Sequence, residues 1–136
     1  MPQEAARNVR RLRPLRVLLV SRDRRFMRVT SFLLERRGYD VLQASSTDVV
    51  EAAVRSRADV VVLEPEPSRA MSARAVAALA ALPTPPGVVM IENGVGERTP
   101  GASAVPKWGQ IDDLAHEIDS ASLYRDTGHA IENLHP

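Results

Sequence analysis

The chain contains no cysteine and only one lysine among its 136 residues. Without cysteine there is no disulfide scaffold, no thiolate zinc site and no cysteine nucleophile, and a reducing compartment is favoured. The apolar runs are short as well. None approaches the ~20 residues of a membrane-spanning helix, and the first residues lack the apolar core of a signal peptide. These absences predict a soluble cytoplasmic protein without membrane insertion.

Aromatic residues make up only 4% of the chain, and the net charge of +1 is too small to indicate a nucleic-acid partner by itself. Residues 1–37 carry most of the arginines, whereas the segment after Gln110 is acidic. No aromatic residues are interleaved with the arginines of residues 1–14, so base stacking is not supported there. A solvated basic extension is therefore favoured over a nucleic-acid-binding arm.

Lys107 is the exception in this arginine-rich composition. Every other member of the 18 basic residues is an arginine. Arginine would serve an ordinary surface role equally well, whereas the two side chains differ in shape and in hydrogen bonding. The sequence therefore indicates a specific role for Lys107.

Short apolar segments alternate with segments of helical period. Residues 60–63 are apolar without polar alternation, as in a strand buried on both faces of a parallel sheet, and they end at Glu64. Asp23 is placed to cap a helix, and Gly38 to end it in the left-handed conformation. The alternation predicts an α/β fold with a doubly wound parallel sheet in three layers. We expect strands over 15–20, 39–43, 60–63, 88–91 and 104–106. We expect helices over 24–37, 68–82 and 111–123, and a further helix that begins after a cap at 46–48. A polar tail should follow over 124–136.

Across about residues 15–122 this pattern resembles the receiver domain of bacterial response regulators. The opening segment through Ser21-Arg22-Asp23, the strand that ends at Glu64, and Val-Pro-Lys107-Trp108 carry the resemblance. It implies a flavodoxin-like sheet of five strands in the order 2-1-3-4-5. In that family an acidic cluster after the first strand binds magnesium, an aspartate after the third is phosphorylated, a Thr or Ser follows the fourth, and a Lys-Pro pair follows the fifth.

The chain departs from the family at most of these positions, and only the lysine is retained, as Lys107. The stretch from Glu92 to residue 101 is also too short for the usual fourth crossover helix, which we expect to be shortened or missing. The remaining substitutions are Ser21 and Arg22 for the acidic pair with Asp23 adjacent, Glu64 for the phosphoacceptor, Glu92 for the Thr/Ser switch residue, Ala104 for the fifth-strand aromatic, and Trp108 for the proline.

These departures predict the loss of the metal and of phosphoryl transfer. Magnesium prefers a shell of oxygens, whereas Arg22 places a permanent positive charge where a ligand should stand. The two acids Glu64 and Glu92 would repel each other unless a cation lay between them. We therefore propose a salt-bridge cluster with Arg22 and Lys107. The alternative is that the acids and Arg22 point into solvent, where an exposed pair contributes only ~0–1 kcal/mol.

The leading interpretation is a pseudo-receiver: a phosphorylation-independent, non-enzymatic adaptor in bacterial signal transduction, without cofactor or metal. Its partner would be another signalling protein, and a homodimer is a further option. Trp108 is a candidate interface residue, with core packing as the alternative. Three rival hypotheses stay open: a functional receiver with Glu64 or Asp23 as acceptor, a nucleotide or anionic-ligand module that uses Arg22, Lys107 and the loop 94–101, and nucleic-acid binding by the N-terminal arginines.

Overall fold

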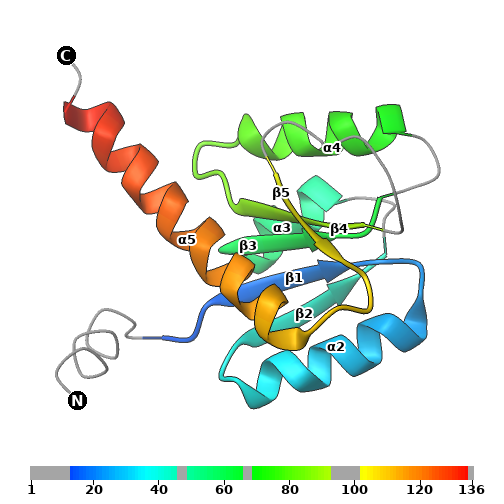
Figure 1. Cartoon of the computed structure of the whole chain (residues 1–136). Helices are drawn as coiled ribbons and strands as arrows, with labels where there is room; N and C mark the ends of the chain where they lie inside the picture. The colour runs from blue at the N-terminus through cyan, green and yellow to red at the C-terminus, as the bar shows by residue number, and fades with distance from the viewer. Residues whose placement is uncertain (1–12, 46–48, 66–68, 93–101, 135–136) are drawn as a thin grey trace, which may run out of the picture.

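The computed structural model describes residues 13–45, 49–65, 69–92 and 102–134. Within these residues strands and helices alternate as the sequence predicts (Figure 1). Asp23 caps the first helix by accepting a hydrogen bond from the backbone N–H of Phe26, and Gly38 has a positive φ of 93°. The elements are β1 (Arg16–Val20), α2 (Arg24–Arg36), β2 (Asp40–Ala44), α3 (Val49–Ser56), β3 (Val60–Leu63), α4 (Arg69–Ala80), β4 (Gly87–Glu92), β5 (Ser103–Pro106) and α5 (Ile111–Leu134).

The five parallel strands form one sheet in the order β2-β1-β3-β4-β5, which confirms the predicted doubly wound topology. Val20 of β1 lies in register with Leu63 of β3, so the two central strands end at the same level. All four residues of β3 are buried, as expected for a strand covered on both faces. Because the strands run in one direction, the residues that follow them gather at one edge of the sheet.

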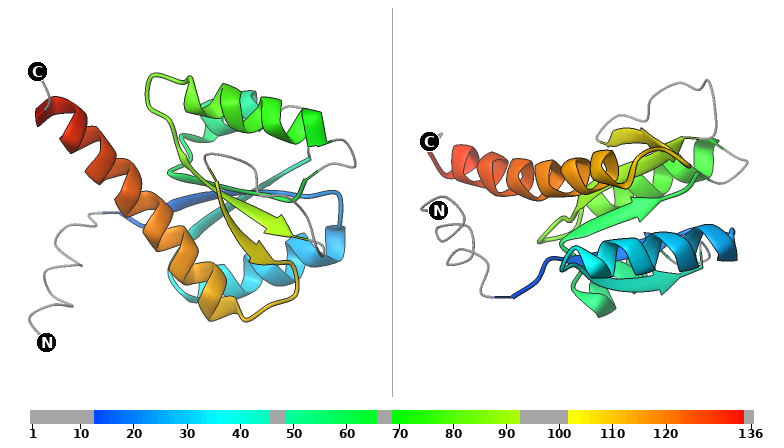
Figure 2. Two further views of the ribbon diagram at one scale, coloured as in Figure 1. Left: turned by 45° about the horizontal axis from the view of Figure 1, so that its top comes forward. Right: turned by 60° about the horizontal axis from the view of Figure 1, so that its bottom comes forward.

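Helices cover both faces of the sheet and make the predicted three layers (Figure 2). α2 and α5 pack on one face, where Phe26 and Ile118 join the buried core. α3 and α4 pack on the other, where Ala53 and Leu79 join a second core cluster. The two apolar layers hold the strand ends in fixed positions relative to α2 and to the start of α5.

The last helix is longer than the sequence analysis predicts. A polar tail from residue 124 was expected, but α5 continues to Leu134. The segment contains no proline, and a single interior glycine, Gly128, costs only about 1 kcal/mol relative to alanine, which does not end the helix. Two other expectations lie outside the described residues: the helix cap at 46–48, and the shortened or missing crossover helix, which falls on 93–101.

Gly87 at the start of β4 lies close against α5. A Cβ atom at this position would lie 2.8 Å from the backbone oxygen of Ala121 and 2.9 Å from its Cβ. We expect Gly87→Ala to lower the free energy of unfolding by about 1–3 kcal/mol, because the helix must move away from the sheet. Urea unfolding measures this loss. Gly109→Ala is the matched control, since its new Cβ would meet Pro106 at an ordinary 3.4 Å; an equal loss in both variants would contradict the prediction.

Candidate functional site

Three of the residues singled out in the sequence meet at the carboxyl edge of the sheet. Ser21 follows β1, Glu64 follows β3 and Lys107 follows β5. Backbone hydrogen bonds extend the sheet to these positions: the N–H of Glu64 donates to the carbonyl of Val20 at 2.9 Å, and the N–H of Lys107 donates to the carbonyl of Glu92 at 3.0 Å. The sheet itself therefore fixes the points from which the polar side chains extend.

Lys107 lies between two carboxylates. Its Nζ atom is 2.7 Å from Oε2 of Glu64 and 2.9 Å from Oδ2 of Asp23. The side chains of Lys107 and Glu64 are only 14% and 9% exposed, whereas that of Asp23 is 34% exposed. The ammonium thus neutralises one buried acid directly and joins it to a second, more accessible acid.

Ser21 completes this network beneath the lysine. Its hydroxyl donates a hydrogen bond of 2.5 Å to Oε1 of Glu64 and accepts one of 2.9 Å from the backbone N–H of Asp23. Asp23 in turn uses one carboxylate oxygen to cap α2 and the other to pair with Lys107. We call Ser21, Asp23, Glu64 and Lys107 the lysine network. Both oxygens of Glu64 have partners within it.

Aromatic rings pack against the network on the side of α2. The Nζ atom of Lys107 lies 5.4 Å from the ring centroid of Phe26, which is fully buried. The ring of Trp108 meets Phe26 edge to face at a centroid distance of 5.4 Å and an interplanar angle of 85°. Trp108 nevertheless remains 59% exposed. It therefore packs on Phe26 at one edge and leaves the rest of its ring exposed, and its role in an interface stays a prediction.

The salt-bridge cluster expected from the sequence is only partly right. Glu64 and Lys107 are paired, as the hypothesis requires. Glu92, however, is half-buried at the end of β4, and within the described part of the chain no ion pair joins it to Lys107. Asp23 takes the place expected for Glu92, because the lysine side chain extends across the sheet edge toward β1. Arg22 is exposed, and Ala104 is half-buried in β5.

The oxygen donors of this edge do not fit a magnesium ion. The two carboxylates, Asp23 and Glu64, both face the ammonium of Lys107, and Arg22 adds a second positive charge at the end of β1. A divalent ion needs several oxygen ligands free of competing cations. Among the described residues, no group of three or more His, Cys, Asp or Glu side chains comes together to hold a metal.

The electrostatics of the network follow from its geometry. Burial alone lowers the pKa of Lys107, but hydrogen bonds to Glu64 and Asp23 and their negative charges outweigh it, so the pKa lies above its ordinary value. The pKa of Asp23 is lowered, first by the hydrogen bond from Lys107 and then by that from the backbone N–H of Phe26. The charged forms of both groups are thus favoured in the folded protein.

Stability should therefore fall at both ends of the pH scale. A raised lysine pKa stabilises the folded state fully below the pKa of the unfolded chain, and this stabilisation is lost as pH rises through the folded pKa. The lowered pKa of Asp23 acts at the acid end, where stabilisation is lost as pH falls through the folded value.

Urea unfolding from about pH 7 to about pH 12 measures the alkaline part. Lys107 is the only lysine in the chain. Asp23→Asn removes one of its two carboxylate partners, so the alkaline loss of stability should occur at a lower pH than in the wild type. An unchanged pH for this loss would contradict the role of Asp23 in raising the pKa of Lys107.

Comparison with known proteins shows which solved structures share this fold. No family model matches the chain, and no curated protein matches its sequence. Solved structures do match. The receiver domain (CheY-like) from Methylobacillus flagellatus aligns with a TM-score of 0.67 and 20% identity, over 79% of this chain and 98% of that one. The receiver domain protein (CheY-like) from Methanospirillum hungatei JF-1 aligns with a TM-score of 0.66 and 17% identity, over 85% and 98%.

A third match is the receiver domain of the hybrid histidine kinase CckA, with a TM-score of 0.54 and 24% identity over 79% of this chain and 98% of that one. The chain therefore has the fold of response-regulator receiver domains and spans nearly the whole length of these three structures. The described part of the chain includes no helix with the length and apolarity needed to cross a membrane.

Sequence reasoning missed the part that Ser21 and Phe26 play in the site. Ser21 was considered only as a lost acid, although its hydroxyl hydrogen-bonds to Glu64. Phe26 was not singled out at all, although its ring contacts both Lys107 and Trp108. The spacing of Asp23 and Phe26, a cap followed three residues later by an aromatic residue, was the available signal.

Proposed function

We propose that this protein is a phosphorylation-independent signalling adaptor: a pseudo-receiver that acts by binding another protein and catalyses no reaction. The observation that carries the proposal is the pairing of Lys107 with Glu64 and Asp23 at 2.7 and 2.9 Å. Glu64 stands where the resemblance places the phosphoacceptor, and its two oxygens are engaged by Lys107 and Ser21.

The lysine network supports a permanently fixed state of the strand-end edge. A phosphoryl group entering here would have to displace Lys107 from Glu64 and would leave Asp23 as a second negative charge beside it. In receiver-like phosphoryl transfer a divalent ion neutralises the charge that builds up, and the oxygen donors of this edge do not fit one. The negative charge of Glu64, already paired with Lys107, stands in for that of a phosphorylated aspartate. The protein would therefore present one surface to its partner at all times.

Intact-mass spectrometry after incubation with acetyl phosphate and magnesium tests this function. The wild-type chain should show no gain of a phosphoryl group. The matched control restores the family's acids in the variant Ser21→Asp/Arg22→Asp/Glu64→Asp, which should gain one phosphoryl group if it folds, as judged by circular dichroism. A phosphoryl group on the wild-type protein would overturn the proposal and favour a functional receiver with Glu64 or Asp23 as acceptor.

A further inference from the structure

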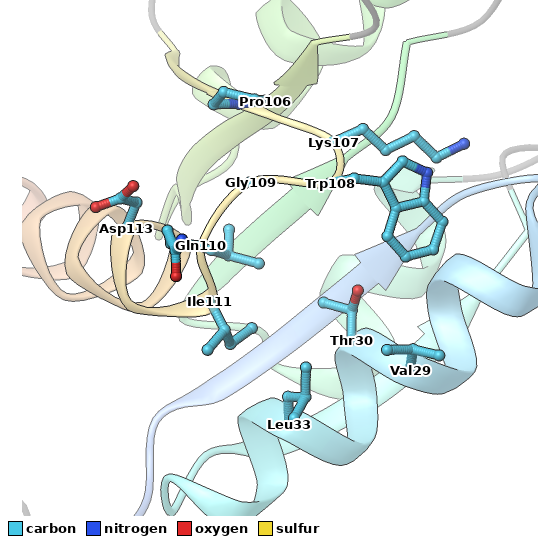
Figure 3. Close-up of a pocket in the computed structure, with 11 residues that line it drawn as sticks. Val29, Thr30, Leu33, Pro106, Lys107, Trp108, Gly109, Gln110, Ile111 and Asp113 are labelled. Atoms are coloured by element: carbon cyan, nitrogen blue, oxygen red, sulfur yellow. The ribbon is translucent and has the colours of Figure 1, made fainter.

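A pocket of about 420 Å³ lies between α2 and the segment that joins β5 to α5. Its size falls within the range of about 300–1,000 Å³ that is typical of ligand sites. Trp108 forms one wall, Val29 and Leu33 of α2 form the facing wall, and Ile111 closes one end (Figure 3). Lys107 also lines the pocket, so the pocket adjoins the lysine network.

The apolar residues around this pocket are unusually exposed. Val29 is 39% exposed and Trp108 is 59% exposed, and Phe32, one turn along α2 from Val29, is 58% exposed. The helical period alone would place Val29 in the core with Phe26, but the structure turns it toward the pocket. A monomeric protein rarely leaves large apolar side chains together at the surface without a binding role.

The outer face of α2 combines these apolar groups with positive charge. Arg25, Val29, Phe32 and Arg36 follow one another at steps of four, three and four residues, which places them in one stripe along the helix. The guanidinium of Arg36 lies 5.7 Å from the centroid of the Phe32 ring. We call this stripe the α2 ridge.

Several acids lie near the ridge and pocket, among them Asp23, which pairs with Lys107, and Asp112, which pairs with Arg37 just beyond α2. Asp113 lines the pocket from the first turn of α5, where the helix N-terminus favours a negative charge. Glu35 is exposed on α2, next to Arg36 in sequence. The positive charge lies beside the pocket, on Arg25 and Arg36 of the α2 ridge, and this ridge meets the pocket at Val29. The ridge therefore complements an acidic partner.

We propose that the pocket and the α2 ridge bind an acidic segment of a partner protein, with one large apolar side chain of that segment inserted between Trp108 and Val29. The partner's carboxylates would pair with Arg25 and Arg36. This inference rests on the proposed adaptor function and names the chemistry of its partner. The site adjoins the network at Lys107, so the fixed state of the network would also fix the position of Trp108.

The arrangement favours a protein over a membrane or a nucleic acid. A bilayer is a flat surface and would leave the concave pocket between α2 and Trp108 unfilled. Nucleic acid would require a continuous basic track, whereas apolar Val29 and Phe32 interrupt the arginines of the ridge. An acidic segment with an apolar anchor matches both the hollow and the charged ridge beside it.

Fluorescence of Trp108, the only tryptophan in the chain, provides a direct test on the full chain. The probes are short synthetic peptides of glutamate with one central leucine, isoleucine or phenylalanine. Binding should shift the Trp108 emission to the blue and saturate, because the exposed indole becomes buried. Replacing the apolar residue with alanine, or the glutamates with glutamine, should weaken binding at least tenfold. Added salt should also weaken it.

Variants locate the binding to the α2 ridge. Arg25→Gln/Arg36→Gln should weaken binding at least tenfold, whereas Arg55→Gln/Arg74→Gln makes the same charge change on the opposite face and should leave it unchanged. The proposal is overturned if no acidic peptide shifts the emission, if the glutamine peptides bind equally well, or if anionic vesicles or an oligonucleotide displace the peptide at lower concentration. These outcomes are independent of the phosphorylation test, so a failure here leaves the adaptor function standing.

Discussion

Replacing Lys107 with methionine is expected to lower the free energy of unfolding by about 3–5 kcal/mol at neutral pH. The change removes the ammonium that lies 2.7 Å from the buried Glu64, although Ser21 still donates a hydrogen bond to this carboxylate. Removing one member of a buried ion pair costs this much because the remaining charge stays away from water. Urea unfolding at neutral pH measures the loss.

Two further variants separate the lost ion pair from lost packing. Adding Glu64→Gln to Lys107→Met removes the uncompensated charge and should recover a large part of the loss. Arg55→Met removes the cation of the exposed Arg55 to Glu51 pair on α3 and should cost less than ~1 kcal/mol. If Lys107→Met and Arg55→Met had similar small effects, the lysine network would not hold this edge of the sheet together.

Phe26→Ala should be comparably destabilising, with a loss of about 3–5 kcal/mol in the free energy of unfolding. Phe26 is 1% exposed and supports both Lys107 and Trp108, so its removal opens a cavity beneath the site. The other phenylalanine, Phe32, is 58% exposed on the same helix and provides the control. Phe32→Ala should cost well under half as much in the same urea titration. Equal losses in the free energy of unfolding for Phe26→Ala and Phe32→Ala would contradict the prediction that the buried ring of Phe26 contributes more to stability.

The same Phe26 variant should change Trp108. Without its edge-to-face partner the indole is held less firmly, so its emission in the absence of any partner should shift to the red. Phe32→Ala should leave the emission of the free protein close to that of the wild type. An unchanged spectrum in Phe26→Ala would contradict the packing of Trp108 on Phe26.

The sequence was enough to predict the sheet because two signals agree along most of the chain. The uninterrupted apolar run of residues 60–63 predicts a strand buried on both faces. The cap at Asp23 and the glycine at position 38 predict a helix between them. Once the strands are placed, parallel topology brings their carboxyl ends together, and the pairing of Glu64 with Lys107 follows. The predicted end of α5 was wrong. After residue 123 the sequence loses its apolar helical period, which suggested that the helix ends there, but it contains no strong helix-ending residue, and α5 continues to Leu134.

The details of the site depend on side-chain directions that spacing does not determine. Glu92 and Asp23 are both acids at strand ends, and the sequence offers no reason for Lys107 to pair with one rather than the other. In the structure Lys107 extends toward Glu64 and Asp23, although its backbone N–H donates to the carbonyl of Glu92. The hydrogen bond from Ser21 to Glu64 likewise depends on the close register of β1 and β3.

The most direct test of the account is a crystal structure of the protein grown in excess magnesium. We predict that Nζ of Lys107 remains within hydrogen-bonding distance of both Glu64 and Asp23 and that no metal ion is bound by their oxygens. An ordered magnesium ion coordinated by Asp23 or Glu64, with Lys107 displaced, would contradict the central claim that this edge of the sheet is fixed by its own ion pairs.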